Sequence, residues 1–279
     1  MTKQTLNHFL RLVCLSLIAL QVATAQSSVN KSDAQPLPIV DVHTHQKLPE
    51  NAGVIGAVRH IDLDAQDSAD VKEQNVVYCA GLRDRIDLKR LAAGLKSKRY
   101  GCIKIYLGYV YRYAYDKEYE PVYALAREYD VPVVFHTGDT YDKKGKLKYA
   151  DPLTIDEVAV DHPDVRFVIA HCGNPWIESA AEVAYKNDNV YLECSALLLG
   201  NLDELPNEQV ETYVVRPISW IFGYVENPTK LMFGTDFPLT DVKSYVNAYK
   251  RAVPKEHWKA VFHDNAVRVF KIPAIKVAP

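Results

Sequence analysis

Short apolar runs alternate along this chain with longer stretches in which apolar residues recur every three or four positions. Runs that are continuously apolar are typical of strands buried on both faces of a parallel sheet. The longer stretches predict amphipathic helices, and the clearest begins near Pro121, with Val122, Leu125 and Tyr129 on one face. The predicted strands cover residues 37–43, 54–61, 75–81, 101–107, 131–136, 165–171, 189–194 and 230–235.

Eight strands that alternate with helices predict an α/β protein, specifically a distorted (β/α)8 TIM barrel over residues 37–279. An open doubly wound sheet is the alternative architecture. The first and fourth predicted strands lie only about sixty residues apart. We therefore expect the second βα unit to be abbreviated.

The first 25 residues predict a signal peptide. Lys3 and Arg11 precede an uncharged apolar run, and Ala23-Thr24-Ala25 supplies the small residues that signal peptidase requires. The run is too short to cross about 30 Å of hydrocarbon as a helix. A lipoprotein at Cys14 is disfavoured, because bulky Val13 precedes it. We expect an exported protein, periplasmic or secreted, with no membrane contact after cleavage and a linker over residues 26–36.

Composition narrows the range of partners. The chain has 33 basic and 35 acidic residues and a formal net charge of -2, so it lacks the cationic surface of a nucleic-acid or membrane binder. A small-molecule substrate is the expected partner, and a homo-oligomer remains open. Cys79, Cys102, Cys172 and Cys194 each fall in or at the end of a separate predicted strand. Because they lack the close spacing of a disulfide framework, buried single thiols are favoured over disulfides.

Metal-competent side chains stand at the ends of four predicted strands. His43 and His45 are two residues apart, so both imidazoles face the same side of the first strand. His136, His171 and Asp236 end or directly follow three other strands. The C-terminal strand ends of a parallel barrel meet on one face, where barrel enzymes place their sites. The pattern therefore predicts a divalent metal site on that face.

Six short motifs occur along nearly the whole mature chain. They are Asp41-Val-His-Thr-His45, Gly101-Cys-Ile-Lys-Ile105, the strand end at His136, Ala170-His-Cys-Gly-Asn-Pro-Trp176, Phe233-Gly-Thr-Asp-Phe-Pro238 and Asn265-Ala-Val-Arg-Val-Phe270. In this order they resemble the amidohydrolase superfamily, in particular the amidohydrolase 2 branch of hydrolases and nonoxidative decarboxylases. The resemblance implies a cation, commonly zinc or manganese, held by His43, His45, His136 and Asp236, with His171 beside it.

The number of metals stays open at this point. In binuclear relatives a carboxylated lysine bridges two cations, and histidines help to hold them. Lys104 and His171 occupy the corresponding positions in this sequence. A lysine in the motif Gly101-Cys-Ile-Lys104 is also frequent in mononuclear relatives, where it lies outside the metal's own ligands. We expect one metal rather than two, zinc in the first place and manganese as the alternative, with Lys104 and His171 next to it.

The candidate chemistry is attack by a metal-activated water, for which Asp236 would accept the proton while His171 orients the substrate. Arg112 is the preferred contact for a substrate anion, with Tyr109 and Arg83 as further substrate contacts. The loop over residues 106–115 is rich in tyrosine. The weaker candidates for the site are His60, Arg85, Glu193 and Ser195.

These features favour a hydrolase of a small amide, lactone or ester. The first alternative is a nonoxidative decarboxylase of an aromatic or unsaturated acid on the same metal site. That reaction needs no attacking water and would use an arginine to hold the substrate carboxylate and an acid to protonate the carbon. A noncatalytic binding protein that keeps the barrel is the second. It is disfavoured because this chain keeps every expected ligand.

Overall fold

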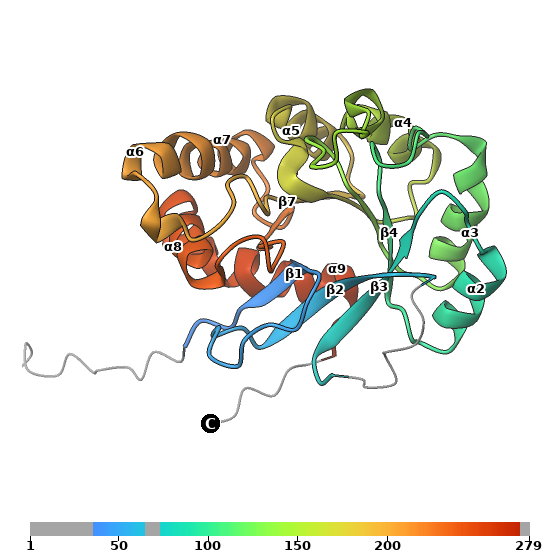
Figure 1. The fold of residues 1–279 in the computed structure, drawn as a ribbon, viewed down its shortest axis with the longest axis horizontal. Coiled ribbons are helices and arrows are strands. Elements are labelled where there is room, and N and C mark those ends of the chain that lie inside the picture. The colour runs from blue at the N-terminus through green and yellow to red at the C-terminus, as the bar shows by residue number, and fades with distance from the viewer. Residues whose placement is uncertain (1–35, 65–72, 274–279) are drawn as a thin grey trace, which may run out of the picture. The chain divides into compact units, whose positions relative to one another are not determined.

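A computed structural model describes residues 36–64 and 73–273 of the chain, and the described residues from Leu37 onward form one compact unit. The predicted signal peptide and nearly all of the predicted linker lie outside the described residues. The unit contains one all-parallel sheet in which eight strands follow each other in chain order (Figure 1). The strands are β1 (Val40–Thr44), β2 (Gly56–Asp62), β3 (Val76–Leu82), β4 (Cys102–Ile105), β5 (Val133–Phe135), β6 (Phe167–Ile169), β7 (Val190–Glu193) and β8 (Leu231–Met232).

The first and last strands are joined through their C-terminal ends, which makes the sheet a barrel. The backbone N–H of Val42 donates to the carbonyl of Phe233 over 3.0 Å, and that of His45 donates to Phe237 over 2.8 Å. The fold is therefore the predicted distorted TIM barrel rather than an open sheet.

Helices lie outside the sheet in most of the connections (Figure 1). They are α2 (Leu88–Lys96), α3 (Glu120–Glu128), α4 (Thr154–Asp161), α5 (Ile177–Lys186), α6 (Asn207–Val210), α7 (Arg216–Val225), α8 (Val242–Ala252) and α9 (Asn265–Phe270). A π turn over Glu211–Val215 joins α6 to α7, and a second one over Ala260–Asp264 precedes α9. The connection from β1 to β2 contains no helix, and residues 65–72 before β3 are outside the description. The first βα unit thus lacks its helix. The second unit, which the spacing predicts to be abbreviated, has most of its connection outside the described residues.

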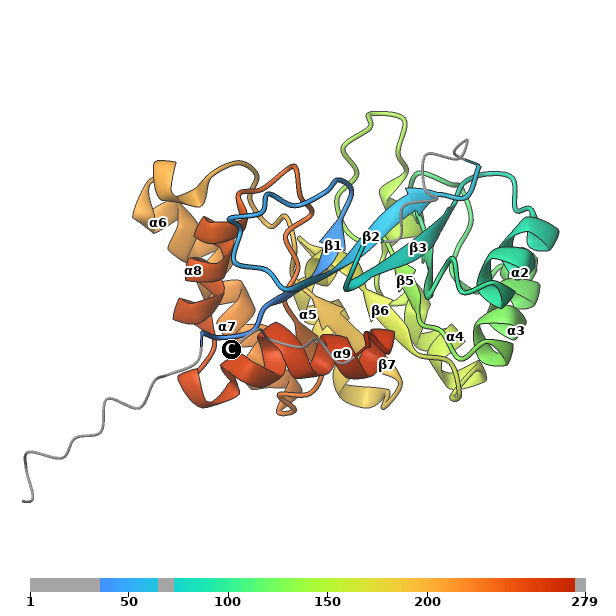
Figure 2. The ribbon, with the colours of Figure 1, turned by 90° about the horizontal axis from the view of Figure 1, so that it is seen from below.

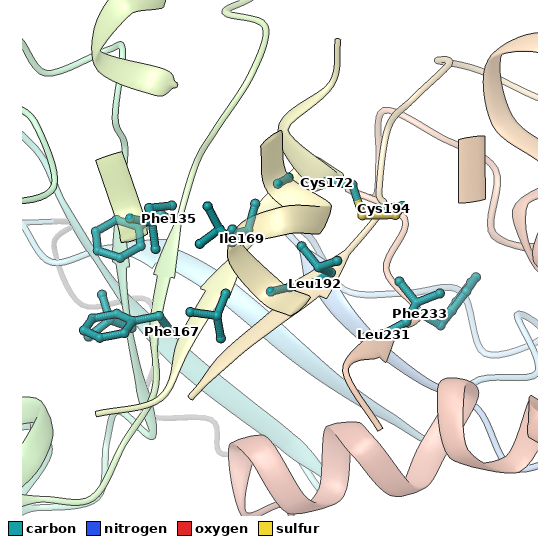
Figure 3. Close-up of a cluster of buried hydrophobic side chains, with 14 of the residues drawn as sticks. Phe135, Phe167, Ile169, Cys172, Leu192, Cys194, Leu231 and Phe233 are labelled. Carbon is teal, nitrogen blue, oxygen red and sulfur yellow. A yellow bond between two sulfur atoms is a disulfide. The ribbon is translucent and has the colours of Figure 1, made fainter. Parts of the chain in front are cut away.

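Two apolar layers stabilise the barrel. One fills its interior, where Val40, Val134 and Val168 meet Val269 and Phe270 of α9. Figure 2 shows α9 running beneath the strands. The other layer lies between the strands and the surrounding helices, and Figure 3 shows its side chains from β5 to β8 as a continuous cluster. Full burial of a valine, leucine, isoleucine or phenylalanine side chain contributes about 1.5–3 kcal/mol to the free energy of unfolding.

The four cysteines of the barrel form two disulfides, so the prediction of single thiols was wrong. Cys79 and Cys102 are register partners on β3 and β4, with Cα atoms 4.4 Å apart. Cys172 lies in the turn after β6 and Cys194 directly follows β7, and their Cα atoms are 4.7 Å apart. Sequence separations of 23 and 22 residues give no sign of these pairs. Cys79 meets Cys102 through the register of β3 with β4, and Cys172 meets Cys194 through the turn that follows β6.

Among residues 36–64 and 73–273, none of the helices has both the length and the apolar character needed to cross a bilayer.

Candidate active site

The end of β1 is fixed to the segment after β8 by a buried carboxylate. Asp41 Oδ1 accepts hydrogen bonds from the backbone N–H groups of His43 and Thr235, both over 3.1 Å. Its other oxygen accepts from the Thr235 hydroxyl over 2.6 Å. Burial raises the pKa of Asp41 to about 7, and these donors oppose the rise. Asp41 therefore sets the position of His43 relative to Asp236, the residue after Thr235.

Two histidines and one aspartate converge at this junction. Asp236 Oδ1 lies 3.2 Å from His45 Nε2 and 3.4 Å from His43 Nε2. Asp236 has a left-handed backbone (φ +66°), a conformation that aspartate tolerates better than most residues. Its N–H donates to the His43 carbonyl over 2.8 Å, which holds the carboxylate against the imidazoles.

Glu193 at the end of β7 orients His43. Its Oε1 lies 2.6 Å from His43 Nδ1, and both side chains are almost fully buried. When Nδ1 carries the proton and donates it to Glu193, Nε2 keeps a lone pair directed at His45 and Asp236. Burial lowers the pKa of His43, as does the nearby positive charge of Lys104. The neutral imidazole that a metal requires is therefore the favoured form.

His171 lies in a tight turn directly after β6, over Ala170–Gly173. Its Nδ1 is 2.9 Å from Ser195 Oγ and 3.2 Å from the Ser195 carbonyl oxygen. Ligand atoms of His43, His171 and Glu193 form a second compact group, within 4.8 Å of one another. The first compact group consists of His43, His45 and Asp236, and it shares His43 with the second. His171 therefore lies beside the first group, as the sequence predicts.

His136 departs from the expected ligand set. It lines the same cavity, but its Nε2 lies 2.8 Å from the carbonyl oxygen of Asp139, and it belongs to neither compact group. Its ring contacts those of Tyr109 and His171, with centroids 4.8 and 4.9 Å away. Burial and the charge of Lys104 lower the pKa of His136 to about 3. In this structure the first group is therefore a three-residue set.

Lys104 of β4 is fully buried, and its Nζ has no hydrogen-bond partner within the described part of the chain. The residue lines the cavity next to the two groups. Burial lowers the pKa of Lys104 to about 8, while the carboxylates of Glu193 and Asp236 act in the opposite direction. An unpaired amine in this place is suited to a ligand that brings its own negative charge.

The cavity above these groups has two lobes. The metal lobe, ≈ 260 Å³, contains the first group, and the leucine lobe, ≈ 240 Å³, has an apolar wall. Residues lining only the metal lobe are His43, His45, Arg83, Lys104, Tyr106 and Asp142; those lining only the leucine lobe are Thr137, Asp139, Asn174, Ala196, Leu197, Leu198 and Leu199. Both lobes share Tyr109, His136, Tyr141, His171, Asp236 and Leu239.

Of the three expected substrate contacts, Arg83 and Tyr109 line the cavity and Arg112 does not. The Arg112 guanidinium forms an ion pair with Glu118, which engages its charge elsewhere. Tyr111 stacks against Tyr149, so this part of the tyrosine-rich loop packs against a neighbouring segment. The expectation that Arg112 binds the substrate anion is therefore not supported by its placement.

Glu193, Ser195 and His60 are weak candidates by sequence but lie in direct contact with the site histidines or beside them. Glu193 and Ser195 contact the site histidines directly, and the His60 ring lies 4.4 Å from that of His43. The only signal in the sequence is that each is a polar residue within or just after an apolar strand. That signal is shared by many residues that only mark where a strand reaches water.

Comparison with known proteins places the chain in a family. The amidohydrolase family model (Amidohydro_2) matches residues 40–272, and the chain belongs to this family. No curated protein sequence matches the chain significantly.

Solved structures share the barrel. A probable 2-pyrone-4,6-dicarboxylic acid hydrolase from Acinetobacter baumannii is 13% identical over 84% of this chain and 99% of its own, with a TM-score of 0.59. A 5-carboxyvanillate decarboxylase from Sphingomonas paucimobilis is 12% identical over 79% and 80%, with a TM-score of 0.54. A manganese-bound 5-carboxyvanillate decarboxylase from Novosphingobium aromaticivorans is 13% identical over 71% and 65%, with a TM-score of 0.51. At these identities the likeness concerns the fold.

The first group fits a divalent cation by its donor chemistry. Two imidazoles and one carboxylate, with ligand atoms within 4.8 Å of one another, match the three-ligand sets of catalytic zinc sites, which leave a further position open. The cavity in front of the group gives access to that position.

Proposed function

We propose that this protein is a metal-dependent hydrolase of a small amide, lactone or ester. The convergence of His43, His45 and Asp236 at one end of the barrel carries the proposal. One divalent cation is proposed, zinc in the first place because the donor set suits it, with manganese as the alternative. The manganese in the related decarboxylase structure supports that alternative.

The side chains present divide the hydrolytic work. A bound divalent cation supplies Lewis-acid polarisation and makes a water molecule more acidic. Asp236 has a second carboxylate oxygen, which can accept a proton from the attacking water and return it to the leaving group. His171 lines both lobes and is held by Ser195, so it can donate a hydrogen bond to the substrate carbonyl. The leucine lobe offers apolar contact to the rest of a small substrate.

The first test combines metal analysis with turnover. We expect stoichiometric metal in the purified protein and chelator-sensitive hydrolysis within a panel of small amides, lactones and esters. Asp236→Asn should lower kcat by at least about 100-fold, because a carboxamide cannot accept the proton. Asp203→Asn, at an exposed carboxylate on the 3₁₀ turn Leu202–Glu204, is the matched control. Full hydrolysis without metal would contradict the proposal.

A second candidate, nonoxidative decarboxylation, is favoured by one observation. The metal lobe contains two cationic side chains, Lys104 and Arg83, each near the ring of Tyr106. The Arg83 guanidinium carbon lies 3.9 Å from the centre of the Tyr106 ring, and Lys104 Nζ lies 5.7 Å from it. Lys104, whose amine has no hydrogen-bond partner among the described residues, can hold a substrate carboxylate as this reaction requires. Arg83 Nε already donates to Asp62 over 3.0 Å, so Arg83 would contribute through its other guanidinium nitrogens.

Release of carbon dioxide from aromatic acids, measured on the same preparation, separates the two reactions. In the decarboxylase, Lys104→Met should raise KM for the acid at least tenfold, because the buried charge that would face the carboxylate is lost. The exposed Lys148→Met is the control. Hydrolysis of uncharged esters with no release of carbon dioxide would reject the second candidate.

We further propose that the protein is exported. The two buried disulfides support this location, because disulfides persist in oxidising compartments and are rare in the cytosol. The mature protein recovered outside the cytoplasm should begin at Gln26 by N-terminal sequencing. Recovery of the intact chain from the cytoplasm would contradict export.

A further inference from the structure

The disulfide between Cys172 and Cys194 lies between residues of the candidate active site. Cys172 directly follows His171, and Cys194 stands between Glu193 and Ser195. Figure 3 shows the bond beside Leu192 and Phe233, at the ends of β7 and β8. Both cysteines are fully buried. Three residues that contact one another in the site are thus direct chain neighbours of a single covalent bridge.

The bridge joins segments that the sheet no longer holds. Pairing of β6 with β7 ends at Ile169 and Leu192, before either cysteine. Beyond that point, the turn over Ala170–Gly173 has left-handed backbone at His171 (φ +61°) and Cys172 (φ +46°). Residues other than glycine keep this conformation only when their surroundings hold them there.

The partner side of the bridge is firmly anchored. The N–H of Cys194 donates to the Tyr249 hydroxyl over 2.9 Å, and the Tyr245 hydroxyl donates to the Cys194 carbonyl over 3.2 Å. Both tyrosines belong to α8 and are fully buried. The disulfide therefore connects the left-handed turn to a fixed point.

We propose that the Cys172–Cys194 disulfide is a positioning element of the active site, which holds His171 against Ser195 and keeps Glu193 on His43. This inference rests on the proposed metal-dependent function, because His43 belongs to the proposed metal site. Without the bridge the turn at His171 can relax, and the contacts between Ser195 and the site histidines loosen with it. Residues that orient metal ligands typically change metal affinity or activity by about 10–100-fold when they are lost.

The second disulfide is a matched control. Cys79–Cys102 is also fully buried and also joins neighbouring strands, and it closes a chain segment of nearly the same length. Loss of either bridge should therefore raise the entropy of the unfolded chain by a similar amount. Cys79 and Cys102, however, lie within the paired part of β3 and β4, where backbone hydrogen bonds already fix them.

The experiment compares Cys172→Ala/Cys194→Ala with Cys79→Ala/Cys102→Ala. Both variants should melt at lower temperature than the parent. At 25 °C only the first should lose metal affinity, by at least tenfold in a zinc titration, with a matching fall in kcat and little change in KM. Cys172→Ala/Cys194→Val, which restores buried volume without the covalent bond, takes its place if the first variant does not fold.

Imidazole nitrogen NMR spectra give a readout that does not need metal. The His43 and His171 signals should shift or broaden in the Cys172/Cys194 variant and stay at parental positions in the control. Equal changes in both variants, or unchanged histidine signals in the first, would overturn the proposal. If the parent protein binds no metal, the proposed function fails, and the histidine spectra still decide the role of the bridge.

Discussion

Glu193 makes a separate contact with each of its carboxylate oxygens. Oε1 lies 2.6 Å from His43 Nδ1 and accepts the backbone N–H of His171 over 3.3 Å, and Oε2 accepts the N–H of Ser195 over 2.8 Å. Burial raises the pKa of Glu193 to about 8, and the positive charge of Lys104 opposes the rise. One carboxylate thus fixes the tautomer of His43 and the backbone next to the other site residues.

Glu193→Gln tests this arrangement at the scale of a single residue. The amide has the same size but only one acceptor oxygen and no charge, so it cannot satisfy all three contacts. We expect zinc affinity to fall about 10–100-fold, because His43 loses the partner that fixes its tautomer. Titration of metal-free protein with zinc measures the effect. Glu182→Gln, at an exposed carboxylate that accepts the Tyr224 hydroxyl, should leave affinity unchanged. Parental affinity in Glu193→Gln would refute the orienting role.

At the scale of elements, an ion pair holds the start of β3 against β2. Arg59 of β2, which is nearly buried, forms a bidentate ion pair with Glu73, three residues before β3 begins. The Arg59 hydrogen bonds lower the pKa of Glu73 below its usual 4.5, and partial burial opposes them. The pair lies at the shortened front of the barrel, where the connection from β1 to β2 has no helix to pack on the sheet.

The Arg59–Glu73 ion pair makes the free energy of unfolding depend on pH. A carboxyl whose pKa is lower in the folded state stabilises the fold above its unfolded pKa, here about 4.5, and that contribution is lost as pH falls through the folded value. Glu73→Gln should therefore be less stable than the parent at pH 7, by up to about 1 kcal/mol. The difference should shrink below pH 4.5. Urea unfolding of both proteins from pH 7 to pH 3 measures it, and a difference that grows on acidification would contradict the assignment.

The elements themselves were largely predictable, since apolar runs and helical periodicity depend on local sequence. The run at residues 131–136 contains β5 (Val133–Phe135), and the pattern after Pro121 marks α3. The contacts that could not be predicted depend on strand register and on the conformation of loops. Cys79 meets Cys102 because β3 and β4 pair in that register, and Arg112 forms an ion pair with Glu118 and does not line the cavity. Neither fact leaves a local signal.

At the scale of the whole barrel, the candidate metal site lies on the seam where the sheet closes. His43 and His45 belong to the end of β1, and Asp236 follows β8. The backbone bonds from Val42 to Phe233, from His45 to Phe237 and from Asp236 to His43 form the rest of that seam. A cation held by side chains from both edges would therefore link the first and last strands, so metal binding and barrel closure should be coupled.

Metal removal tests this coupling. A ligand that binds only the folded state stabilises it by RT ln(1 + [L]/Kd), about 2.7 kcal/mol when free zinc is 100 times the Kd. Chelation should therefore lower the Tm of the parent protein, and zinc should restore it. In His45→Ala, whose replaced side chain is about one-third exposed (34%), the metal-free fold should persist while the response to zinc is largely lost. Equal Tm values for parental protein with and without zinc would mean that no cation links the edges of the seam. A full zinc response in His45→Ala would place the cation on other ligands, such as the second compact group of His43, His171 and Glu193.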